Sequence, residues 1–180
     1  MPTHAAFLRG MNVGGHRITN AELAAVFSAA GFAEVHVFRA SGNVAFAASE
    51  PPQGDLARSI EEGLLAALGY AVPTFVRTAA EVRAIAATSP FQSGRAAGRG
   101  GRPQVALLSG TPGAGERREV LALAGAGEQL VFAGSELHWL PSAGVLDSEL
   151  DLRALEAALG PLTLRTKGTV DLLAAKHFAG

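Results

Sequence analysis

The residues best placed to bind a ligand lie in two turns near the amino terminus. A guanidinium, side-chain amides and the backbone N–H groups of a glycine-rich turn are donors suited to a phosphate or a carboxylate. The sequence therefore predicts a small anionic ligand at these turns. The candidate ligand-binding residues are Arg9, Asn12, Gly14, Gly15, His16, Ser41 and Asn43.

These turns can meet only if the elements around them form a particular sheet. His4–Leu8 is short and apolar, as a buried strand is, and a helix is expected from Thr19 to Ala30 with a capping box at Thr19 and Glu22. Two strands, Val35–Phe38 and Val44–Phe46, follow as a hairpin. In a split β-α-β arrangement the first two strands are parallel with the third between them, so both turns lie at one end. The helix N-terminus is expected to add partial positive charge there.

A structural interpretation of the same residues stays open. Glycines permit turns in any protein, Asn43 can hold its turn through its own side chain, and Arg9 can pair with a carboxylate. The run Gly10–Gly15 is neither a Walker motif nor a dinucleotide-binding fingerprint. His16 would titrate near neutral pH within the proposed site.

No nucleophile elbow is present, so the residues assign no catalytic role, and the sequence leaves open whether the protein is an enzyme.

The order of elements predicts an α+β fold with two tandem ferredoxin-like β-α-β-β-α-β subdomains, each with an antiparallel sheet. Residues 1–78 form the first subdomain, 79–102 a connecting helix and a Gly/Arg-rich linker, and 103–180 the second with a C-terminal helix. Hydrophobic spacing and turn signals place the remaining elements. They are helices at Asp55–Leu68, Ala79–Ala87, Glu116–Ala124 and Glu149–Leu159, and strands at Val72–Val76, Gln104–Leu108, Gln129–Phe132, Leu137–Leu140 and Leu162–Arg165.

Composition excludes several classes of protein. The 180 residues contain no cysteine, so disulfide scaffolds, thiolate zinc sites and cysteine nucleophiles are excluded together. The formal net charge of −1 gives no basic excess for general binding to nucleic acid or anionic lipid. The five histidines show no metal-ligand spacing, so neither a metal nor a cofactor is expected. No signal peptide or membrane span is recognisable, and a cytoplasmic location is expected.

One motif links the chain to a family. The stretch Phe7–Gly15, followed by Ala21–Leu23, closely resembles the bacterial family known as domain of unknown function 1697 (DUF1697). The similarity continues at Ala40–Val44 and Ser89–Phe91, and also at 71–73 and 76–78. The resemblance implies two related α+β subdomains and supplies no activity.

The chain departs from the usual pattern of this family at two places. His16 replaces a basic residue that usually follows the paired glycines. In the segment Thr163–Val170, Thr166 and Lys167 stand where the family usually has Asn and Trp. Any role of that Asn or Trp in relatives is therefore not carried over to this chain.

An alternative function is a nucleic-acid or protein interaction module. Arg95, Arg99 and Arg102 lie among glycines, as in RNA-binding segments, although a solvated linker explains them equally. An RNA-binding sheet would need exposed aromatic residues, and Phe7 and Phe46 lie in predicted strands but among apolar neighbours that favour the core. Nucleic acid is thus an unfavoured partner, and the oligomeric state does not follow from the sequence.

Overall fold

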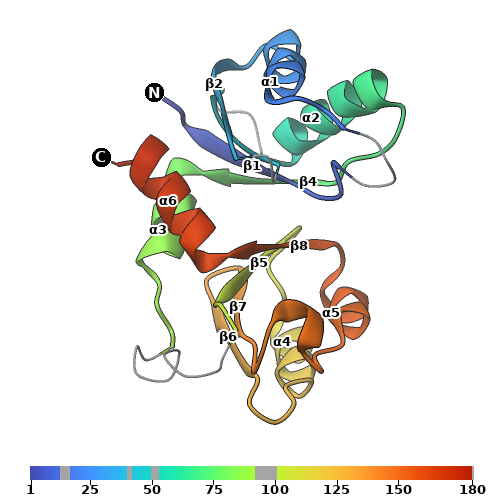
Figure 1. Ribbon diagram of the computed structural model, residues 1–180, viewed down its shortest axis with the longest axis vertical. Helices are drawn as coiled ribbons and strands as arrows, with labels where there is room; N and C mark the ends of the chain where they lie inside the picture. The colour runs from blue at the N-terminus through green and yellow to red at the C-terminus, as the bar shows by residue number, and fades with distance from the viewer. Residues whose placement is uncertain (13–16, 40–41, 50–52, 92–100, 180) are drawn as a thin grey trace. The chain divides into compact units, whose positions relative to one another are not determined.

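The computed structural model describes residues 1–12, 17–39, 42–49, 53–91 and 101–179 (Figure 1). The chain divides into two compact units. Unit 1 consists of Met1–Ala84 together with Leu172–Gly180, and unit 2 consists of Ile85–Asp171.

Unit 1 is built on a four-stranded antiparallel sheet. Its strands are β1 (His4–Leu8), β2 (Ala33–Phe38), β3 (Asn43–Ala47) and β4 (Thr74–Thr78), in the order β2-β3-β1-β4. Because β3 is antiparallel to both of its neighbours, β1 and β2 run parallel with β3 between them, as the sequence predicts. Helices α1 (Asn20–Ala29) and α2 (Gln53–Leu68) lie on one side of this sheet (Figure 1).

Unit 2 repeats this arrangement. The strands β5 (Gln104–Leu108), β6 (Gln129–Ala133), β7 (Glu136–Leu140) and β8 (Leu162–Thr166) pair in the order β6-β7-β5-β8, again antiparallel. Helices α4 (Ala114–Leu121) and α5 (Leu152–Leu159) lie on one side, with the 3₁₀ turn η1 (Val145–Asp147) before α5. Helices α3 (Ala79–Ala87) and α6 (Lys167–His177) follow β4 and β8 without a loop. The structure confirms an α+β fold with two four-stranded antiparallel sheets.

The two units match in strand register as well as in strand order. Arg77 lies opposite Ala5 in the pair of β4 with β1, and Arg165 lies opposite Val105 in the pair of β8 with β5. Each guanidinium donates to the carbonyl oxygen of the residue before it, over 2.8 Å in both cases. Burial lowers the pKa of Arg165 to about 10, so this guanidinium stays charged at neutral pH.

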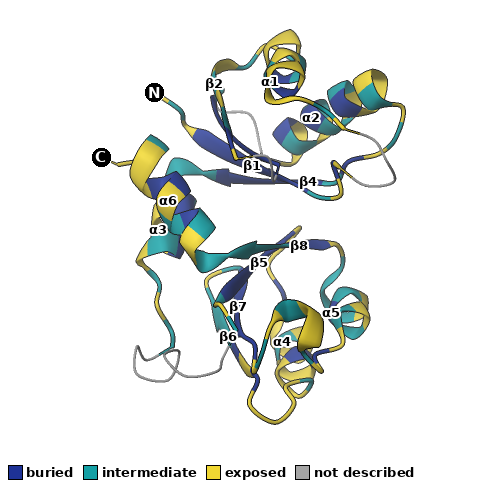
Figure 2. Ribbon diagram, viewed as in Figure 1, coloured by how far each residue is buried: buried dark blue, intermediate teal, exposed yellow. Residues whose placement is uncertain are grey.

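Each unit has its own hydrophobic core between its sheet and helices (Figure 2). In unit 1, Leu23 and Phe27 are buried one helical turn apart on α1, which is the face expected from their spacing. Phe7 and Phe46 are fully buried, as predicted, so neither can stack on a nucleic-acid base. In unit 2, Trp139 belongs to the core.

Within the described residues, no helix combines the length and the apolar character needed to cross a membrane.

Several predicted boundaries differ from the structure, and two of these differences have a local explanation. Helix α5 begins at Leu152 rather than Glu149, because Asp151 is its N-cap and accepts hydrogen bonds from the N–H groups of Arg153 and Ala154. Strand β4 begins at Thr74 rather than Val72. The N–H of Thr74, its first residue, donates to the Glu61 carboxylate of α2 at 2.7 Å, which anchors the start of the strand.

Candidate functional site

The two candidate turns of unit 1 lie against each other. The N–H of Leu8, the last residue of β1, donates to the carbonyl oxygen of Gly42 at 2.7 Å. Gly42 has φ +70°, and a Cβ there would lie 3.1 Å from both the Cβ and the carbonyl oxygen of Leu8. A glycine is required at this position for both reasons, since L residues avoid this φ and the space is already filled. The loop after β1 and the β2–β3 turn therefore share one end of the sheet.

The loop after β1 is fixed at two points among the described residues. Gly10 turns the chain with φ +69°, and the carbonyl oxygen of buried Met11 accepts a hydrogen bond of 2.5 Å from the Tyr70 hydroxyl. The side-chain oxygen of Asn12 accepts the N–H of Ile18 at 3.3 Å. Asn12 thus links the beginning of the loop to Ile18, the residue before the N-cap of α1.

Two other predicted site residues are described at this end. Asn43 is fully buried, and its amide donates to the Phe38 carbonyl oxygen at 3.3 Å, which gives it a part in closing the β2–β3 turn. Arg9 is partly exposed, and its backbone N–H donates to the Pro73 carbonyl oxygen at 2.9 Å. The remaining predicted residues, Gly14, Gly15, His16 and Ser41, lie outside the described residues.

The start of helix α1 carries a capping box, as predicted. The Thr19 hydroxyl accepts the N–H of Glu22 at 3.2 Å, and the Glu22 carboxylate accepts the N–H of Thr19 at 2.7 Å. These hydrogen bonds from Thr19 lower the pKa of Glu22, so its carboxylate is ionised at neutral pH. The carboxylate of Glu22 offsets part of the partial positive charge that the helix N-terminus is expected to add at this end.

Two arginines at this end were not identified from the sequence. Arg17 lies in the loop before α1 and Arg39 directly after β2, and both are exposed. Within the described ranges, neither makes an ion pair. Arg39 has φ +59°, and its guanidinium lies 5.5 Å from the centre of the Phe38 ring. A non-glycine residue held in this backbone region is strained, and such strain is common at ligand sites.

Comparison with known proteins supports the family and the fold. A family model described as "Protein of unknown function (DUF1697)" matches residues 1–138, which confirms the resemblance seen in the sequence motifs. The structure of the conserved bacterial protein SP0830 from Streptococcus pneumoniae is similar over 97% of both chains, with a TM-score of 0.72 and 18% sequence identity. At that identity the similarity concerns the fold alone. No curated protein matches the chain significantly.

Proposed function

Since this chain belongs to the DUF1697 family, which is described only as being of unknown function, we propose a function from the geometry of unit 1. The protein binds a small anionic ligand, bearing a phosphate or a carboxylate, at the adjoining turns after β1 and β2. The observation that carries this proposal is the hydrogen bond between Leu8 and Gly42, which joins the two turns that contain the candidate donors.

The charges at this end favour an anion. Arg9, Arg17 and Arg39 come from the two turns and the loop before α1, and Arg17 and Arg39 have no ion-pair partner among the described residues. Guanidinium groups bind the oxygens of phosphates and carboxylates in a bidentate geometry, which suits a ligand with two or more oxygens. In this proposal Asn12 and Asn43 position the turns, as their hydrogen bonds indicate.

The other predicted residues complete the proposal. Gly14 and Gly15 would present backbone N–H groups to the ligand, and Ser41 a hydroxyl. His16 would add a group whose protonation near neutral pH strengthens the binding of an anion.

A thermal-shift titration tests the proposed site. Inorganic phosphate, sugar phosphates and small carboxylates are titrated against sodium chloride at matched ionic strength. A ligand at about 100 times its Kd adds roughly 2.7 kcal/mol to the free energy of unfolding, which is a clear rise in Tm. Arg39→Ala is expected to remove that rise without lowering the Tm of the unliganded protein, because Arg39 is exposed.

Arg58→Ala is the matched control. Arg58 is also an exposed arginine of unit 1, but it pairs with Asp55 on α2 at 3.3 Å. This variant should respond to the ligand as the unaltered protein does. The proposal is wrong if no phosphate or carboxylate raises the Tm, or if Arg39→Ala and Arg58→Ala respond alike.

We also propose that each unit is a ferredoxin-like fold and that the chain arose by internal duplication. The order β2-β3-β1-β4, repeated as β6-β7-β5-β8, supports the first part. The matching places of Arg77 and Arg165 in the two registers support the second.

A further inference from the structure

Unit 2 contains a small recess that is separate from the turns discussed above. Its volume is about 80 Å³, and its walls include the apolar side chains of Pro90, Phe91 and Pro103. Polar side chains also line it, namely Thr88, Ser89, His138 of β7 and Lys167 at the start of α6. Because a water molecule occupies about 30 Å³ in the liquid, the recess admits a group of only a few non-hydrogen atoms.

His138 is almost fully buried beside this recess. Its side chain is 2% exposed, and it makes no hydrogen bond to any residue that the structure describes. Burial and the nearby Lys167 charge lower the pKa of His138, so the ring is neutral at pH 7 and carries one N–H donor. The ring can therefore donate one hydrogen bond to a group that enters the recess.

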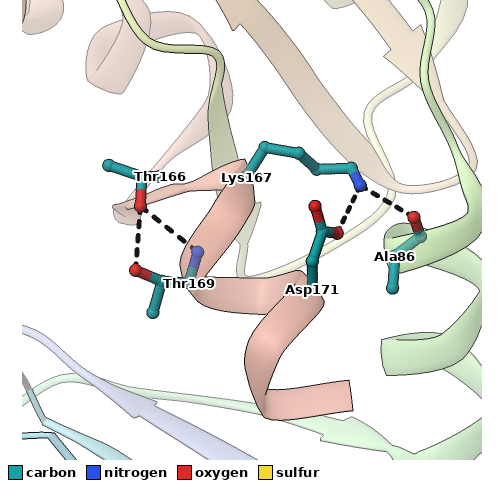
Figure 3. Close-up of polar contacts among 5 residues, drawn as sticks. All are labelled: Ala86, Thr166, Lys167, Thr169 and Asp171. Atoms are coloured by element: carbon teal, nitrogen blue, oxygen red, sulfur yellow. Dashed lines mark hydrogen bonds and ion pairs between the residues drawn. The ribbon is translucent and has the colours of Figure 1, made fainter. Parts of the chain in front are cut away.

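Lys167 brings a positive charge to the same recess. Its ammonium group donates to the Ala86 carbonyl oxygen at 2.7 Å and to the Asp171 carboxylate one helical turn away (Figure 3). An ammonium group has three N–H donors, so one remains after these two hydrogen bonds. The side chain is 13% exposed, and it lies at the N-terminus of α6, where the helix dipole opposes a cation. An additional negative partner would relieve this unfavourable placement.

We propose that the recess binds the carboxylate of a small monocarboxylic acid, with one oxygen accepting from Lys167 and the other from His138. The apolar walls would contact the short carbon chain of the ligand. A phosphate fits less well, because it is larger and its second charge would face Asp171. This site does not depend on the function proposed for unit 1.

A nuclear magnetic resonance titration tests this site on the full chain. The ring resonances of His138 are followed while sodium acetate replaces sodium chloride at constant ionic strength. Acetate is expected to shift them saturably. Lys167→Met should weaken acetate binding about tenfold, because it removes a charge-assisted hydrogen bond. Asp171→Asn should strengthen it, because the competing carboxylate is removed. Lys176→Met, which changes the other lysine of α6, should leave it unchanged.

Lys167→Met and Asp171→Asn are expected to change acetate binding in opposite directions, so the test remains decisive even if one variant fails to fold. If Lys167→Met fails to fold, stronger acetate binding by Asp171→Asn still supports the site, and unchanged or weaker binding overturns it. Absence of a saturable shift at His138 overturns the proposal, as does tighter binding of inorganic phosphate than of acetate. Because the readout is His138 itself, a negative result leaves the unit 1 site untouched, and a failure of that site leaves this one untouched.

Discussion

Replacing Glu128 with glutamine is expected to destabilise unit 2, because this carboxylate collects four hydrogen bonds. Glu128 lies just before β6 and accepts from the indole N–H of Trp139, from the hydroxyl groups of Ser142 and Ser148, and from the N–H of Ser142. The carboxylate therefore ties the end of the β7 segment to the segment before α5. A glutamine of the same shape keeps one acceptor oxygen but turns an N–H₂ group toward donors.

The expected loss is about 2 kcal/mol of the free energy of unfolding. A hydrogen bond to a charged group contributes roughly 1.5–3 kcal/mol, against about 1 kcal/mol for a neutral one. Trp139 is 1% exposed and Ser148 is partly buried, so the hydrogen bonds that these two residues donate to Glu128 should each become weaker by about 1 kcal/mol. Ser142 is exposed and can bond to water instead, so it adds little.

The same site makes stability depend on pH. Burial acts to raise the pKa of Glu128, but the hydrogen bonds from Trp139, Ser148 and Ser142 outweigh it, so the pKa lies below its usual value. The folded state therefore binds the proton less readily than the unfolded chain does. The stabilisation is complete above the unfolded pKa of about 4.3 and is lost as the pH falls through the lower folded value. The glutamine variant should lack this contribution.

Urea unfolding followed by fluorescence measures this effect, since Trp139 is the one tryptophan of the chain and a partner of Glu128. Glu119→Gln is the control, because Glu119 is an exposed glutamate of α4 in the same unit. The reasoning is refuted if Glu128→Gln lies within about 0.5 kcal/mol of Glu119→Gln at pH 7, a difference typical of surface substitutions. An identical slope of stability against pH in the two variants would refute the account of the pKa.

Three further predictions concern other positions. Burial first, and then the electrostatic effect of His36 and Lys176, lower the pKa of His177, so the folded protein should lose stability as the pH falls below about 6.5. His177→Phe should reduce this loss, which is measured as the fall in Tm with pH. Gly42→Ala should lower the free energy of urea unfolding by at least about 1 kcal/mol, because it forces a positive φ on alanine and crowds Leu8. Thr166→Ala should cost about 1 kcal/mol in the same assay, because it removes the acceptor for the first turn of α6.

The element order and the meeting of the two turns were predictable from the sequence, because they follow from short-range signals. Apolar runs, capping pairs and glycine turns each concern a few neighbouring residues, as at Thr19 with Glu22. The parallel placement of β1 and β2 then follows from the connections alone. The start of α5 was less predictable. The chain forms η1 first, and Asp151 then acts as the N-cap, so residues 149–151 stay outside the helix although their sequence predicts one.

The polar residues that were missed depend on longer-range structure. Arg39 is an ordinary charged residue in the sequence, and only its positive φ and its position directly after β2 in the structure distinguish it. His138 and Lys167 are 29 positions apart and meet because β5 pairs with both β7 and β8. Their spacing matches no motif, so only the register of the sheet identifies them as neighbours.

The matching registers of the two units show which residues of unit 1 correspond to the donors of the recess in unit 2. In unit 1 the residue opposite Ala5 on β3 is Ala45, whereas His138 holds the corresponding place opposite Val105. The first residue of the helix after the last strand is Ala79 in unit 1 and Lys167 in unit 2. An alanine at both places supplies neither an imidazole nor an ammonium group, so the equivalent part of unit 1 cannot hold a carboxylate in this way. In the two proposals, the same backbone arrangement thus presents donors at the turns after β1 and β2 in one unit and beside the first residue of α6 in the other.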